Sequence, residues 1–190
     1  MKSQMHKAII FLFMLWNINL YSQKHFINFT QVKVDSISSI EENFNSKVYT
    51  SDLDLVTTMN DSIVNYGKLK KYRRPKNNIY GKIVVTYFYL KNDSIVRDIH
   101  YSWIPPQNSR LKEFSKQFDL IVKDIATELG LAVEEQGKLT KKKEEVVVGE
   151  TVKIKERRVI WEYKGFEILI LMAYYTKNEG QLNIWIKKSR

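Results

Sequence analysis

One long amphipathic helix pattern set among strand patterns constrains the fold of this chain more than any other feature. Between Asn108 and Gly130 the apolar side chains recur at intervals of three and four residues, which predicts a helix with one buried stripe: Leu111, Phe114, Phe118, Ile121, Val122, Ile125 and Leu129. Such a stripe has to pack on another apolar surface. The segments on both sides of it follow strand patterns, so we expect that surface to be a β-sheet.

Strand patterns precede and follow the predicted helix. Residues 79–90 are rich in β-branched and aromatic side chains on both parities, which is typical of a central strand, and residues 95–103 alternate as its hairpin partner. Three further runs follow the helix and are joined by connections short enough to force antiparallel pairing: residues 159–163, 166–174 and 182–186. A weaker pattern predicts a small hairpin over residues 146–154.

Two short helices are expected before the first strand. Ile37, Ile40 and Phe44 share one side of a helix over residues 35–44, with Ser39 and Glu42 spaced as a capping box. A second helical pattern covers residues 56–66 and ends at Gly67.

The patterns together predict an α+β fold. We expect an antiparallel sheet of about five strands with one long amphipathic helix packed on one face and one or two short N-terminal helices. The sequence has no internal repeat, low-complexity tract or interdomain linker, so residues 23–190 are expected to form a single domain.

Residues 1–22 have the layout of a secretory signal. Basic residues precede an apolar run over residues 8–16, and Ser22 offers a small residue before cleavage at Gln23. This segment resembles the short, Lys-started, Ser-Gln-ended leaders of envelope proteins in Gram-negative bacteria, which implies export to the periplasm or beyond the cell. The apolar run is shorter than the roughly 18 to 20 residues of a membrane-spanning helix, so we expect no transmembrane segment in the mature chain.

The residue types present exclude several chemistries. The chain has no cysteine, which excludes disulfides, a thiolate nucleophile, Cys-ligated zinc, iron–sulfur clusters and a lipoprotein anchor. Asp98, His100 and Ser102 are the residue types of a hydrolase triad, but alternate residues of a strand lie about 6.6 Å apart, too far for a nucleophile and its base. They are better explained as the solvent side of a half-buried strand. We therefore expect no catalytic residues, no metal site and no cofactor.

Positive charge is the remaining functional signal, with a formal net charge of +10. The candidate site for an anionic partner is one basic segment: Lys68, Lys70, Lys71, Tyr72, Arg73, Arg74 and Lys76. A second basic cluster follows later: Lys138, Lys141, Lys142, Lys143, Lys153, Lys155, Arg157 and Arg158. The alternative is that both segments are solvated surface in a Lys-rich protein.

Aromatic side chains on the predicted strands allow a second kind of surface. Tyr80, Tyr89, Tyr175 and Trp185 would form a platform for a glycan, a peptide or another sheet if they shared the open face. Packing in the core or across strands is the simpler explanation.

These observations predict an exported, non-enzymatic binding or interaction module for a protein, a glycan or an anionic envelope surface, with nucleic acid an unlikely partner. A secreted hydrolase, with carboxylates such as Asp119 or Glu128 brought together by the fold, is one alternative. A periplasmic inhibitor or immunity-type protein is another. Convergence of the two basic segments beside an aromatic patch would favour binding, whereas separation would leave both as solubility features.

Overall fold

The structure is a computed structural model that describes residues 27–50, 68–90, 92–106, 108–147, 150–175 and 180–189. The chain divides into two compact units, Met1–Thr30 and Gln31–Arg190. In the first unit, Thr30 donates hydrogen bonds from its backbone and its hydroxyl group to the Asn28 side chain. The elements below all belong to the second unit.

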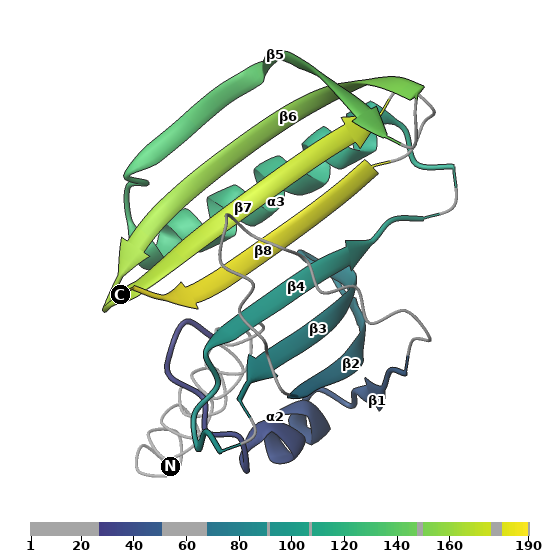
Figure 1. The fold of residues 1–190 in the computed structure, drawn as a ribbon. Helices are drawn as coiled ribbons and strands as arrows, with labels where there is room; N and C mark the ends of the chain where they lie inside the picture. Colours follow the sequence, from purple (N-terminus) through teal and green to yellow (C-terminus); the bar gives the residue numbers. More distant parts are fainter. Residues whose placement is uncertain are drawn as a thin grey trace, which may run out of the picture. The chain divides into compact units, whose positions relative to one another are not determined.

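The second unit is built on one antiparallel sheet of eight strands, in the order β1-β2-β3-β4-β8-β7-β6-β5 (Figure 1). The strands are β1 (Lys47–Val48), β2 (Lys68–Asn77), β3 (Gly81–Tyr89), β4 (Asp98–Ile104), β5 (Glu134–Val147), β6 (Glu150–Tyr163), β7 (Phe166–Tyr175) and β8 (Gly180–Lys188). Strands β1–β4 and β5–β8 are two meanders, and α3 connects them, so that β4 pairs with β8. The chain is α+β with an antiparallel sheet, but the expected sheet of about five strands is wrong.

The basic segment is one strand that the prediction missed. Residues 68–77 form β2 and pair with β3, with Tyr72 opposite Val85 and Arg74 opposite Ile83. Tyr72 and Arg74 are buried whereas Arg73 between them is exposed, as expected for a strand with one face on the core. The density of cationic residues concealed this alternation because a buried arginine does not look apolar in the sequence.

The second correction concerns the hairpin expected over residues 146–154. Strands β5 and β6 each span 14 residues, and their pairing runs from Val147 opposite Glu150 to Glu134 opposite Ile160. The lysines between residues 138 and 143 are therefore part of strand β5 and do not lie in a loop before the hairpin. Strand β6 also pairs with β7 from Ile154 to Tyr163, so tertiary pairing places lysines and glutamates in strands despite their low strand propensity.

The long helix is confirmed as α3 (Leu111–Leu129), with Phe114, Phe118, Ile121 and Ile125 buried. It packs on β6, β7 and β8 (Figure 1). Gly130 follows the helix with a φ of 81°, which glycine adopts readily, and its carbonyl accepts a hydrogen bond from the Trp161 indole at 3.0 Å.

The first short helix is confirmed as α2 (Ile37–Asn43), but its expected capping box is not formed. Ser36 precedes the helix, and the Ser39 hydroxyl donates back to the Ser36 carbonyl at 2.9 Å. The helix predicted over residues 56–66 lies outside the described residues.

Both helices lie on the same face of the sheet, which we call the helix face. In the register, Arg74, Ile83 and Trp103 stand side by side, so their side chains share this face. Arg74 contacts Glu41 of α2, and Trp103 packs on Phe114 of α3. We call the other side the opposite face; it carries His100 and Trp185, which are register partners.

Candidate functional site

The structure places the seven residues of the basic segment on both faces of β2 rather than in one patch. Arg74 is fully buried and Tyr72 is 8% exposed. Lys70 and Lys71 are half-buried, while Arg73 and Lys76 are exposed. Lys68 is the first residue of the strand, and its side chain lies outside the described part. The arginine expected to bind an anion therefore belongs to the interior.

Arg74 forms an ion pair inside the unit with Glu41, which is 1% exposed. The Arg74 Nη2 atom donates to Glu41 Oε1 at 2.5 Å, and its Nε atom donates to Oε2 at 3.1 Å. The Tyr87 hydroxyl donates to Glu41 Oε1 and the Ser46 hydroxyl to Oε2, at 2.5 and 2.6 Å. The Arg74 guanidinium also lies 3.9 Å from the centre of the Phe44 ring.

The electrostatics of this group follow from its burial. Burial alone would lower the pKa of Arg74, but the hydrogen bond and the charge of Glu41 contribute to raising it overall. Burial raises the pKa of Tyr87, so its hydroxyl stays protonated and continues to donate. The group holds α2 on β2 and β3, and it has no free charge to offer a ligand.

The two basic clusters do not converge. Strands β3, β4, β8 and β7 separate β2 from β6 in the sheet (Figure 1). In the second cluster, Arg157 pairs with Asp119 of α3 at 2.8 Å, and Arg158 pairs with Glu134 at 2.6 Å. The separation removes the single basic patch that would have supported binding.

The carboxylates proposed for a hydrolase occupy ordinary surface positions on α3. Asp119 is 61% exposed and is engaged by Arg157. Glu128 is exposed. Among the described residues, no three histidine or acidic side chains are grouped so that they could hold a metal ion.

His100 departs from the expected solvent side of β4, because it is half-buried. Its ring stacks on Trp185 with centres 3.6 Å apart and an angle of 5° between the planes. Ser102 donates to the Asn183 side chain at 2.7 Å, and Asn183 also hydrogen-bonds His100. Within the described part of the chain the His100 Nε2 atom is buried without a hydrogen-bond partner. Burial lowers the pKa of His100 to about 4, although the Asn183 hydrogen bond opposes the shift.

The lowered pKa of His100 predicts that the folded chain loses stability in acid. The pKa of His100 is about 4 in the folded chain against 6.5 for an ordinary histidine, so between these values the unfolded chain binds more protons. The free energy of unfolding should therefore fall by about 2 kcal/mol from about pH 7 to about pH 5, as measured by urea denaturation. His100→Phe keeps an aromatic ring on Trp185 and should flatten this dependence. An equally steep fall in the variant would assign it to other groups.

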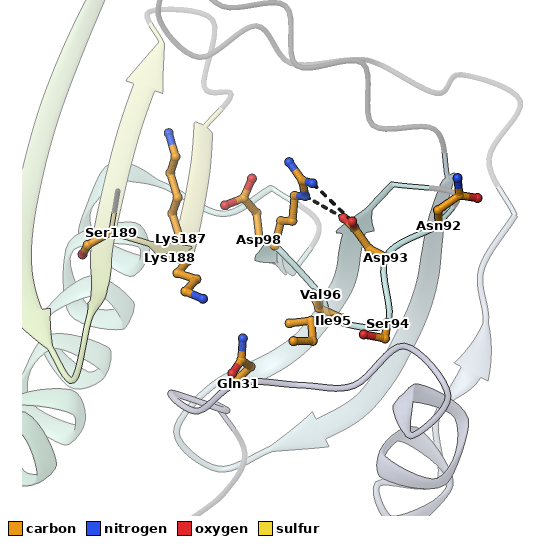
Figure 2. A pocket seen from close by; sticks show the side chains of 11 residues that line it. Gln31, Asn92, Asp93, Ser94, Ile95, Val96, Asp98, Lys187, Lys188 and Ser189 are labelled. Carbon is orange, nitrogen blue, oxygen red and sulfur yellow. Dashed lines mark hydrogen bonds and ion pairs between the residues drawn. The ribbon is translucent and has the colours of Figure 1, made fainter.

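A pocket at one end of the sheet brings charged side chains together from segments that are far apart in the sequence (Figure 2). Its volume is about 520 Å³. The lining comes from Gln31, the segment between β3 and β4, and the end of β8: Gln31, Asn92, Asp93, Ser94, Ile95, Val96, Arg97, Asp98, Lys187, Lys188 and Ser189. The cations are Arg97, Lys187 and Lys188, and the acids are Asp93 and Asp98.

Hydrogen bonds shape the segment between β3 and β4. Arg97 donates to both Asp93 oxygens, at 2.6 and 3.2 Å (Figure 2). The Leu90 backbone amide donates to Asp93 at 3.0 Å. These bonds, above all those from Arg97, lower the pKa of Asp93. The Val96 amide donates to the Val32 carbonyl at 2.8 Å, which ties the segment to the chain next to Gln31. The wall of the pocket is thus held in place by its own residues.

The end of β8 supplies the other two cations. Lys187 stands opposite Asp98 in the register, and the Lys188 amide donates to the Arg97 carbonyl at 3.4 Å. Both lysine side chains are exposed, and Figure 2 shows Lys188 reaching towards Gln31. An ammonium group and an amide that line the same pocket can donate to one carboxylate or phosphate.

Sequence reasoning missed this pocket. Lys187 and Lys188 are an ordinary pair of lysines near the end of the chain, and nothing in their spacing connects them with Arg97 or Gln31. Only the pairing of β4 with β8 brings them together.

The four aromatic residues suggested as a platform do not share a face. Tyr80 is buried, and its hydroxyl donates to Asp124 of α3 at 2.5 Å. Tyr89 is 6% exposed and is on the helix face, in line with Val85 and Tyr87. Trp185 stacks on His100 on the opposite face, and the alternation of β7 places Tyr175 on that face too. The aromatic residues therefore support packing rather than a ligand platform.

Comparison of the chain with models of known families, with curated proteins and with solved structures finds no match. Among the helices that the structure describes, none is long and apolar enough to cross a membrane.

Proposed function

We propose that the chain is an exported, non-enzymatic binding module that takes an anionic group of a larger envelope partner into the pocket beside Lys187 and Lys188. The observation that carries the proposal is that three cations, Arg97, Lys187 and Lys188, line one hollow of about 520 Å³ and outnumber its two acids, Asp93 and Asp98. The leader pattern in residues 1–22 supports export.

The charges in the pocket differ in what they can offer a ligand. Asp93 engages Arg97 through two hydrogen bonds, so this arginine is oriented before any ligand arrives. The exposed lysines at the end of β8 are the groups best placed to donate to an incoming carboxylate or phosphate. Gln31 and Ser189 add uncharged donors to the lining.

Binding suits this pocket better than acid–base catalysis. A general acid has to hold a proton near neutral pH, whereas Arg97 lowers the pKa of Asp93 and keeps it ionised. The carboxylate alternative based on Asp119 is weakened by its ion pair with Arg157. An acidic protein is one partner that the same pocket would take, so the inhibitor or immunity role remains a special case of the proposal.

The test is a titration followed by NMR with two probes, inorganic phosphate and the carboxylated glycan polygalacturonate. We expect shifts of the backbone amides of residues 187–189 with at least one probe. The double substitution Lys187→Gln and Lys188→Gln should weaken binding by about tenfold or more, because each charged hydrogen bond contributes about 1.5–3 kcal/mol. The protein is produced with its own N-terminus and recovered by osmotic shock, which tests export in the same preparation.

The matched control is the double substitution Lys47→Gln and Lys82→Gln. It removes the same charge from two exposed strand positions that do not line the pocket. An equal loss of affinity in the two double variants would show that net charge alone explains the effect. Unshifted backbone amides at residues 187–189 with both probes would contradict the proposed binding site. Retention of an uncleaved chain in the cytosol would contradict export.

A further inference from the structure

Strand β5 leaves one long edge of the sheet open. Within the part of the chain that the structure describes, β5 pairs with β6 alone, and it stands last in the order of the sheet. It spans 14 residues, whereas β1 at the other edge spans two. An edge strand carries a row of backbone donors and acceptors that a strand of another chain can complete. Strand β5 is long enough to take part in such pairing, and β1 is not.

The charges along β5 are arranged in an order that complements itself. Three lysines, residues 141–143, are followed by Glu144 and Glu145. This stretch pairs regularly with β6, because the one irregularity in the ladder lies between Gln136 and Lys141. Two copies of a strand that pair antiparallel run in opposite directions, so the basic half of each copy lies beside the acidic half of the other.

Symmetry narrows the possible registers to a few. A two-fold axis between antiparallel strands of one sheet is perpendicular to that sheet, so one residue must stand opposite its own copy. With Lys143 at the centre, Lys142 stands opposite Glu144 of the second copy and Lys141 opposite Glu145 of the second copy, each twice. The one unfavourable pair is Lys143 with its own copy.

The neighbouring registers are less favourable. With Glu144 at the centre, Glu144 stands opposite its own copy. The one remaining pair of opposite charges is then Lys143 with Glu145 of the second copy. With Lys142 at the centre, Lys141 stands opposite Lys143 of the second copy. Lysines on an edge strand usually prevent pairing, but here glutamates at matching distances compensate them in one register.

We propose that this chain forms a two-fold symmetric dimer in which β5 of each copy pairs antiparallel with β5 of the other, centred on Lys143. The sheet then continues from one copy into the next, and the edge is no longer open. The interface is one strand wide, so the dimer is expected to be weak, to depend on protein concentration and to weaken at high salt. This proposal does not depend on the pocket or on its ligand.

Charge exchange on the full chain tests the dimer by sedimentation equilibrium. Lys142→Glu and Glu144→Lys each replace two attractive pairs with two repulsive ones, and each should weaken dimerisation by about tenfold or more. The double variant with both substitutions restores opposite charges and should recover most of the affinity. An equimolar mixture of the two single variants should form mixed dimers.

The fold of the single variants is checked separately. Lys142 stands opposite Lys155 of its own chain in β6, so Lys142→Glu brings opposite charges together within the hairpin. Loss of dimer in this variant therefore cannot be attributed to a weakened hairpin, and circular dichroism confirms that it is folded. Lys82→Glu and Glu162→Lys make the same charge changes at exposed positions on β3 and β6, and should leave dimerisation unchanged.

Two results would overturn the proposal. One is a wild-type chain that stays monomeric at high micromolar concentration and low salt. The other is a dimer in which the single variants, the double variant and the mixture all associate alike, which would place the interface elsewhere on the molecule.

Discussion

Replacing Glu41 with glutamine is expected to destabilise the chain by about 3–5 kcal/mol, the range for removal of one partner from a buried ion pair. Arg74 would keep its charge at a position with no solvent exposure. Tyr87 and Ser46, which both donate to Glu41, would meet a weaker acceptor. Urea denaturation at neutral pH measures the loss.

A second variant separates the effect of an unpaired charge from that of lost packing. Glu41→Met together with Arg74→Met removes both charges, and it should recover a large part of the stability lost in Glu41→Gln. The exposed pair of Glu134 and Arg158 provides the control, because Glu134→Gln should cost less than about 1 kcal/mol. Similar small losses in Glu41→Gln and Glu134→Gln would show that solvent reaches the Arg74 guanidinium.

The second large effect is expected at Phe114, where Phe114→Ala should cost about 3–5 kcal/mol. The ring is 1% exposed and meets Trp103 and Tyr174 edge to face, with centres 5.0 and 5.3 Å away. It joins the start of α3 to β4 and β7, which belong to different meanders. Removing it opens a cavity and loses both aromatic contacts.

Gly180 provides an internal test of this packing. A Cβ atom added at Gly180 would lie 2.7 Å from Cε1 of the Phe114 ring, so Gly180→Ala should destabilise the wild-type chain. In the Phe114→Ala background the ring is gone, and the same substitution should cost less. A double-mutant cycle by thermal denaturation measures this coupling. Strictly additive effects would mean that the ring does not occupy the space above Gly180.

Periodicity predicted the elements whose apolar residues repeat without interruption. The stripe from Leu111 to Leu129 identified α3, and the alternation in residues 166–174 and 182–186 identified β7 and β8. Strand β2 was missed because its inward positions include Arg74, which is stabilised there by Glu41 from a helix about thirty residues earlier. Long-range pairing of this kind leaves no periodic mark in the sequence.

The candidate site was less accessible to prediction than the fold. Charge density pointed to residues 68–76, yet the most buried of these cations is part of the core. The pocket combines Gln31, the turn around Asp93 and the lysines at the end of β8, and these meet only through tertiary structure. Composition showed that the chain is basic, but it could not show which cations converge.

The connection of the two meanders through β4 and β8 bears on how the chain folds. Within β2–β4 and within β5–β8, consecutive strands pair after short connections, so these pairings have a low contact order. Joining the meanders requires contacts such as that between Ser102 and Asn183, which are 81 positions apart. The β4–β8 strand pair and the contacts of α3 have to repay the loop-closure entropy of this step, so we expect the seam to form more slowly than the hairpins within each meander.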